Sequence, residues 1–130
     1  LGLCYANGDG ITEDFTKAAE WFQKAAKQGH AGAQHNVGSC YYNGTGVTKD
    51  LTKAVEWFQK AAEQGVSKAQ YNLGACYENG YGTPKDLTNA VEWLRKAADQ
   101  GNADAQKALN SILSKNRAGK MQASEQADGL

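Results

Sequence analysis

The sequence has few of the residues from which metal sites and catalytic centres are built. It contains two histidines, one methionine and three cysteines in 130 residues. His30 and His35 are separated by a predicted turn and have no cysteine or carboxylate at ligand spacing, so we expect no metal site. No nucleophile, base and oxyanion hole can be assembled, and no glycine-rich loop has phosphate-binding spacing. We therefore expect neither a cofactor nor an enzymatic activity.

Net charge and long apolar segments are also lacking. Fourteen basic residues balance fourteen acidic ones, so no global field attracts nucleic acid or an anionic membrane. No apolar run approaches the roughly 20 residues of a membrane span. The opening "LGLCYANGDG" lacks an initiator Met and the basic and apolar regions of a signal peptide. We expect no nucleic-acid partner and no membrane insertion, and we expect the chain to be part of a longer protein.

What the sequence does have is strong self-similarity. Trp21, Trp57 and Trp93 are 36 residues apart. Aligning residues 1–36 with 37–72 gives 23 identical positions of 36, and aligning 37–72 with 73–108 gives 21. Repeats of 20 to 50 residues are the signature of solenoids and related arrays.

Each unit contains two helical patterns. The first runs from Ala31 to Asn43, with Val37 and Cys40 on one apolar face. Gly38 lies within that face and predicts the close approach of a neighbouring helix. The second runs from about Leu51 to Gln64 and has a broad apolar face with alanines. A hairpin of this kind cannot bury its apolar face alone, so the pattern predicts an all-α fold, an α/α solenoid of stacked antiparallel hairpins.

Glycine-rich segments punctuate the units and predict turns between the two helices: "GDGITED", "GTGVTKD" and "GYGTPKD". Pro84 fits the first turn of a following helix, and either Thr83 or Asp86 could cap that helix. The pairs Trp21-Phe22 and Trp57-Phe58 are expected in the core or as a partly exposed groove wall, because they lie at helical spacing among alanines.

The segment from Ala69 to Gly101 resembles a nearly complete Sel-one-like repeat (SLR), a relative of the tetratricopeptide repeat. Asn89 and Leu94 depart from the family pattern, and the resemblance covers residues 1 to about 113. It implies a right-handed superhelix and adaptor or scaffold roles, often in bacteria and often in exported or signalling complexes. The matching positions are Leu73, Gly74, Tyr77, Gly80, Gly82, Asp86, Ala90, Trp93, Ala97 and Ala98.

These observations divide the chain into two parts. Residues 1–115 form the SLR solenoid, with about three repeats, of which the first begins half-way through its first helix. The terminal helix, from Ala103 to about Lys115, has Asn110 where the other repeats have glycine and is expected to cap the stack. Residues 116–130 are polar and without clear periodicity, so we expect a disordered tail. The isolated block is expected to be a monomer.

The cysteines recur once per repeat, as Cys4, Cys40 and Cys76. Equivalent residues of adjacent repeats should lie about 10 Å apart, beyond disulfide reach. Some SLR proteins carry two cysteines per repeat and bridge the helix pair, which one cysteine per repeat does not allow. We expect buried, unreactive thiols. These favour a reducing compartment such as the cytoplasm, while a periplasmic or secreted location stays open.

Candidate binding residues are those that vary between repeats along the first helix while the scaffold stays constant, together with Asn43 and Asn79, which adjoin that side. In the related tetratricopeptide fold this side of the first helix lines the concave surface, and the resemblance implies the same here. A solvated polar face is the alternative. Gly32, Ala75, Ser111 and Ser114 vary in the same way, and Tyr81 is a further aromatic residue in a turn. The candidates are His35, Ser39, Tyr42, Asn43, Lys68, Tyr71, Glu78, Asn79, Asp104 and Lys107.

Three functions are compatible with these features. The first is a protein-interaction module that binds a peptide or partner protein on its concave face, as an adaptor or scaffold. The second is a structural spacer or docking block within a longer protein. The third, an enzyme, would need a catalytic constellation that the sequence does not show.

Overall fold

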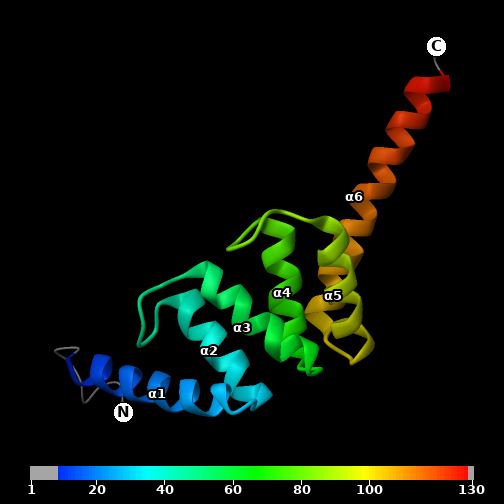
Figure 1. Ribbon diagram of the computed structural model, residues 1–130. Helices are drawn as coiled ribbons and strands as arrows, with labels where there is room; N and C mark the ends of the chain where they lie inside the picture. The colour runs from blue at the N-terminus through cyan, green and yellow to red at the C-terminus, as the bar shows by residue number, and fades with distance from the viewer. Residues whose placement is uncertain (1–8, 129–130) are drawn as a thin grey trace.

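The computed structural model describes the backbone of residues 9–128 and the side chains of residues 14–115. This part of the chain is all-α, with no strand. Helices adjacent in sequence pack against each other, and Figure 1 shows them stacked in chain order, with the end of α6 extending away from the others. The predicted all-α solenoid is confirmed. The helices are α1 (Asp9–Lys27), α2 (Ala31–Asn43), α3 (Leu51–Glu63), α4 (Ser67–Asn79), α5 (Leu87–Asp99) and α6 (Ala103–Asp128).

Glycine allows the two helices of each hairpin to approach closely. A Cβ on Gly38 of α2 would lie 2.6 Å from Cδ1 of Phe58 in α3. In the next hairpin, a Cβ on Gly74 of α4 would lie 2.8 Å from Cγ of Leu94 in α5. Both distances are too short for a side chain, so the predicted reason for a glycine inside the helix is confirmed.

Aspartates define where the second helices begin. Asp50 and Asp86 are the N-caps of α3 and α5, and each carboxylate accepts a hydrogen bond of 3.1 Å from the backbone N–H three residues later. Asp86, not Thr83, therefore caps α5. The placement of Pro84 in the first helical turn was wrong, because Pro84 precedes the cap and lies in the turn between α4 and α5.

Buried glutamines link successive repeats, a feature that the sequence analysis did not predict. Gln34 of α2 donates from Nε2 to the carbonyl of Ala26 in α1 at 3.2 Å. Its Oε1 accepts from Nε2 of Gln64, just after α3, at 2.8 Å. Gln70 repeats this arrangement with Gln100, again at 2.8 Å. Because each glutamine is buried, its amide needs these partners, and the pairs fix one repeat on the next.

The first predicted turn is wrong, because the helix α1 already begins at Asp9 within "GDGITED". The two later turns pack on the preceding second helix: Gly46 lies against the carbonyl of Phe15, and Gly82 against that of Leu51. Gly10, at the equivalent position, has no earlier second helix within these 130 residues on which to pack. Helical hydrogen bonding then replaces the packed turn over this segment.

The last helix is longer than predicted, since α6 continues past Lys115 to Asp128. The helices α2 and α4 end at Gly44 and Gly80, both in the left-handed conformation. The equivalent residue in α6 is Asn116, and residues 116–128 contain no proline. Without a glycine at the usual stop position the helix continues, and the disordered tail predicted there is helical in the structure as far as residue 128. Residues 129–130 lie outside the described part.

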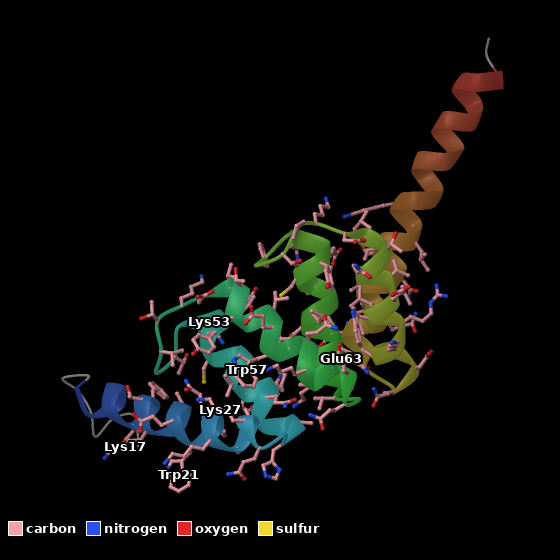
Figure 2. The ribbon with its side chains drawn as sticks, in the orientation of Figure 1. Lys17, Trp21, Lys27, Lys53, Trp57 and Glu63 are labelled. Atoms are coloured by element: carbon pink, nitrogen blue, oxygen red, sulfur yellow. The ribbon has the colours of Figure 1, made fainter. Side chains whose placement is uncertain are left out.

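The tryptophans differ in exposure along the stack. Trp93 packs against the core cluster formed by α3 and α4, and Trp57 is half-buried. Trp21 is 72% exposed, and Figure 2 shows its side chain pointing away from the other helices. The prediction that Trp21 belongs to the core or a groove wall is therefore wrong, whereas Phe58 is a core residue.

Candidate functional site

A cavity of about 300 Å³ lies between α2 and α4, and we call it the α2/α4 cavity. Five of its lining residues are candidates named from the sequence: Ser39, Tyr42, Asn43, Tyr71 and Asn79. The structure thus brings together half of the ten predicted contact residues. The complete lining is Ser39, Tyr42, Asn43, Phe58, Tyr71, Asn72, Ala75, Cys76, Asn79 and Tyr81.

Aromatic rings form part of the wall. The ring of Tyr42 lies 6.4 Å from that of Phe58 and 6.4 Å from that of Tyr81, the second pair in an edge-on arrangement. Burial raises the pKa of the Tyr42 hydroxyl, with smaller contributions from Cys76 and the neighbouring tyrosines. The hydroxyl is therefore protonated at neutral pH and can both donate and accept a hydrogen bond.

Two carboxamides at the cavity are held in position by hydrogen bonds. Asn79 donates from Nδ2 to the carbonyl of Ala75 at 2.9 Å. Nδ2 of Asn72 lies 3.1 Å from Nε2 of His35 and donates to it when that nitrogen carries no proton. Both bonds use the amide nitrogen, which leaves the two Oδ1 atoms as acceptors for a ligand.

His35 lies beside the cavity and is not part of its lining. Its ring is half-buried, 5.8 Å from the ring of Phe58. Burial is the main cause that lowers the pKa of His35, the charge of Lys68 lowers it further, and a hydrogen bond with Asn36 raises it. A neutral imidazole next to Asn72 keeps this side of the site uncharged near neutral pH.

The remaining candidates lie away from the α2/α4 cavity. Glu78 lines a smaller cavity of about 170 Å³, which Asn79 also lines. Lys68, Asp104 and Lys107 are exposed and line neither cavity. The structure therefore does not join all ten candidates into one site.

Asn72 was missed by sequence reasoning, as were Phe58 and Cys76 as lining residues. The candidates were residues that vary between repeats or adjoin such positions, whereas Asn72 has the same identity as Asn36 in the preceding unit. The available signal was that a repeated asparagine inside a helix is unfavourable and needs a partner. Phe58 was assigned to the core, where it does lie, and it also lines the cavity.

The two cysteines of the described residues carry free thiols. Cys76 is buried, and burial raises its pKa to about 11. Cys40 is half-buried, and burial raises its pKa as well. Because the thiolate is the reactive form, Cys76 lines the cavity as an apolar residue rather than as a nucleophile. Cys4 lies outside the described residues.

The described part of the chain has neither a candidate metal site nor a candidate membrane helix. No group of three or more His, Cys, Asp or Glu side chains there could hold a metal ion. No helix there combines the length and apolar character needed to cross a membrane.

The helix pairs, the glycine contacts and the repeat period define an α-helical repeat solenoid. The Sel1 repeat family model matches residues 1–30, 31–66 and 67–102. The chain therefore belongs to the Sel1 repeat family, whose members are typically protein-interaction modules and generally non-catalytic scaffolds.

Solved structures agree with this assignment. The chain is similar to a Sel1 repeat protein from Oxalobacter formigenes, with 41% identity and a TM-score of 0.70 over 72% of this chain and 39% of that one. The chain is also similar to a protective antigen of uropathogenic Escherichia coli with an SLR fold. The sequence identity is 41% and the TM-score is 0.79, over 88% of this chain and 25% of that one. For cysteine-rich protein B of Helicobacter pylori the sequence identity is 30% and the TM-score is 0.66, over 70% of this chain and 68% of that one. The chain thus spans well under half the length of the first two relatives. No curated protein matches it significantly.

Proposed function

We propose that the chain is an interaction module that binds a peptide or a loop of a partner protein in the α2/α4 cavity. The observation that carries this proposal is the clustering of candidate residues, of which Ser39, Tyr42 and Tyr71 differ between repeats. Ser39, Tyr42, Asn43, Tyr71 and Asn79 were selected for variation or for adjoining the variable positions, and all five line one cavity. The side of the first helices on which they lie is the side that the resemblance implies is concave.

The physical properties of the cavity support binding. Tyrosines provide large contact areas with little conformational entropy to lose, and they are enriched in binding hot spots. Tyr42 and Tyr71 are already half-buried on packed helices. A partner therefore meets a preformed surface, which lowers the entropic cost of association.

The experiment is a pull-down from lysate of the parent organism with matched variants. Tyr42→Ala with Tyr71→Ala should reduce capture of a specific partner at least about tenfold, as expected when two hot-spot side chains are truncated. Asp104→Ala with Lys107→Ala, two exposed candidates outside the cavity, should leave capture unchanged. Far-ultraviolet circular dichroism should show both variants to be helical. Equal capture by the two variants would contradict the proposal.

The spacer function stays a second candidate because the chain covers only 39% and 25% of the first two relatives. In that case the repeats would position other parts of a longer protein. Loss of a partner through the cavity variant alone argues against a pure spacer. If the unmodified chain captures no partner in the pull-down, the spacer function is favoured.

A further inference from the structure

We infer that the α2/α4 cavity selects an extended segment of the partner that places an uncharged side chain between Tyr42 and Tyr71. This inference rests on the proposed function and names the chemistry of the ligand. It follows from the charge, the hydrogen-bonding groups and the size of the cavity.

Charge is the first argument. None of the ten lining residues is acidic or basic. Lys68 and Glu78, the charged candidates on α4, do not line the cavity. Asn43, Asn79 and Tyr81 keep the cavity open to solvent on one side. A charged side chain placed against the other lining residues would lose part of its water without gaining a counter-ion from the lining, which is unfavourable. An amide, hydroxyl or apolar side chain carries no such penalty.

The hydrogen-bonding groups favour an extended backbone. Asn72 and Asn79 use their amide nitrogens within the protein and leave their Oδ1 atoms as acceptors. The hydroxyls of Tyr42 and Tyr71 add groups that both donate and accept. A helical ligand satisfies its own backbone N–H and C=O groups, whereas an extended segment leaves them free to pair with these four side chains.

Size gives the third argument. About 300 Å³ is at the lower end for a ligand pocket and fits one or two side chains rather than a packed helix. Ser39 lies on the wall, and its equivalent in α6, Ser111, is exposed and outside the cavity. These two serines offer a matched pair for testing the charge preference.

The probe is a phage-displayed library of random heptapeptides, selected on the 130-residue chain and followed by synthetic peptides with capped ends. We expect a shared uncharged anchor residue, and replacing that anchor with Asp or Lys should weaken binding at least about tenfold. Ser39→Asp places a carboxylate in the cavity and should reverse the ranking so that the Lys-anchored peptide binds better than the parent peptide. Ser111→Asp should leave both affinities unchanged.

Two results would overturn the inference and leave the proposed function standing. One is the selection of peptides that share a charged anchor residue and bind the parent chain and the Ser39→Asp variant with equal affinity. The other is selection of no peptide although the Tyr42 and Tyr71 pull-down variant loses its protein partner. If that pull-down variant retains its partner as well, the proposed function fails too. Tyr42-dependent binding of a neutral oligosaccharide, with no peptide selected, would also overturn the inference.

Discussion

The interior of the stack and its C-terminal end use different residues at the same repeat position. Gly38 and Gly74 lie where the second helix of each hairpin touches the first, and neither has room for a Cβ. The equivalent residue of α6 is Asn110, which is exposed. An asparagine side chain at this position would occupy the space that Phe58 and Leu94 fill next to Gly38 and Gly74. Glycine at this position is thus tied to the close helix contact seen in the two described hairpins.

The glutamines show the same contrast. Gln70 is 5% exposed and joins α3, α4 and the segment after α5 through hydrogen bonds. Gln106, its equivalent in α6, is exposed and donates to Oδ1 of Asn110 at 2.9 Å within its own helix. The same residue type links repeats in the interior and is satisfied locally at the end. Ala98, the counterpart of Ala62, is present, but the 130 residues contain no counterpart of Gln100, the residue that donates to Gln70.

The largest expected effect comes from an interior turn. Gly82 and Gly101 both have positive φ, at +72° and +92°, so alanine is strained at either position. Only at Gly82 would the Cβ also overlap the backbone carbonyl of Leu51, which cannot move aside. Gly82→Ala should lower the free energy of unfolding by about 4 kcal/mol and Gly101→Ala by about 1 kcal/mol, measured by urea denaturation. Equal losses would show that the packed turn does not hold the repeats together.

A smaller effect is expected at the helix contact itself. In Gly74→Ala the new Cβ would lie too close to the side chain of Leu94, which must shift. It would also lie 3.2 Å from the backbone carbonyl oxygen of Ala90. The expected loss is about 2 kcal/mol in the free energy of unfolding. The matched change at the end of the stack, Asn110→Ala, removes only an exposed hydrogen bond and should alter stability by less than about 0.5 kcal/mol. A loss at Asn110 as large as that at Gly74 would argue that both positions have the same packing.

The buried glutamine gives the third comparison. Gln70→Leu keeps the side-chain volume and removes the hydrogen bonds with the Ala62 carbonyl and with Gln100, so we expect a loss of about 1 kcal/mol. Gln106→Leu removes one exposed bond within a helix and should be nearly neutral. The measurement is again urea denaturation, at one pH and temperature. A neutral Gln70→Leu would mean that the apolar replacement offsets the lost bonds and that the interior link is not a source of stability.

Most of the fold followed from the sequence, because it depends on features repeated three times. The bounds of α2 and the start of α3 follow from helical periodicity and from the turn glycines. The observed bounds of α1 and α6 differ from the predicted ones, and neither segment has a further repeat within these 130 residues on which to pack. The apolar period of a segment indicates that it can form a helix. The contacts that the segment makes with neighbouring helices determine whether its ends form a turn or continue the helix.

The candidate site was predicted in part, and for a related reason. Variation between repeats found Tyr42 and Tyr71, whose identities differ from those of their equivalents. It could not find Asn72, which repeats Asn36, nor exclude Lys107, which varies but lies on α6 away from the cavity. Which varying residues share a cavity depends on how α2 and α4 are spaced, and a single sequence does not give that spacing.

The smallest expected effect is a pH dependence of stability caused by the half-buried His35. Burial holds the pKa of His35 below its ordinary value of 6.5, so the unfolded chain binds a proton at this residue before the folded chain does. Stability from His35 is complete above pH 6.5 and falls as the pH decreases toward the lower, folded-state pKa. His35→Gln should reduce the difference in unfolding free energy between pH 7.5 and pH 5.5, by less than the effect of Gln70→Leu. Because each variant is compared with itself at two pH values, any loss of the ring contact between His35 and Phe58 cancels. An unchanged pH difference in His35→Gln would show that the interior imidazole is as accessible to protons in the folded chain as in the unfolded one.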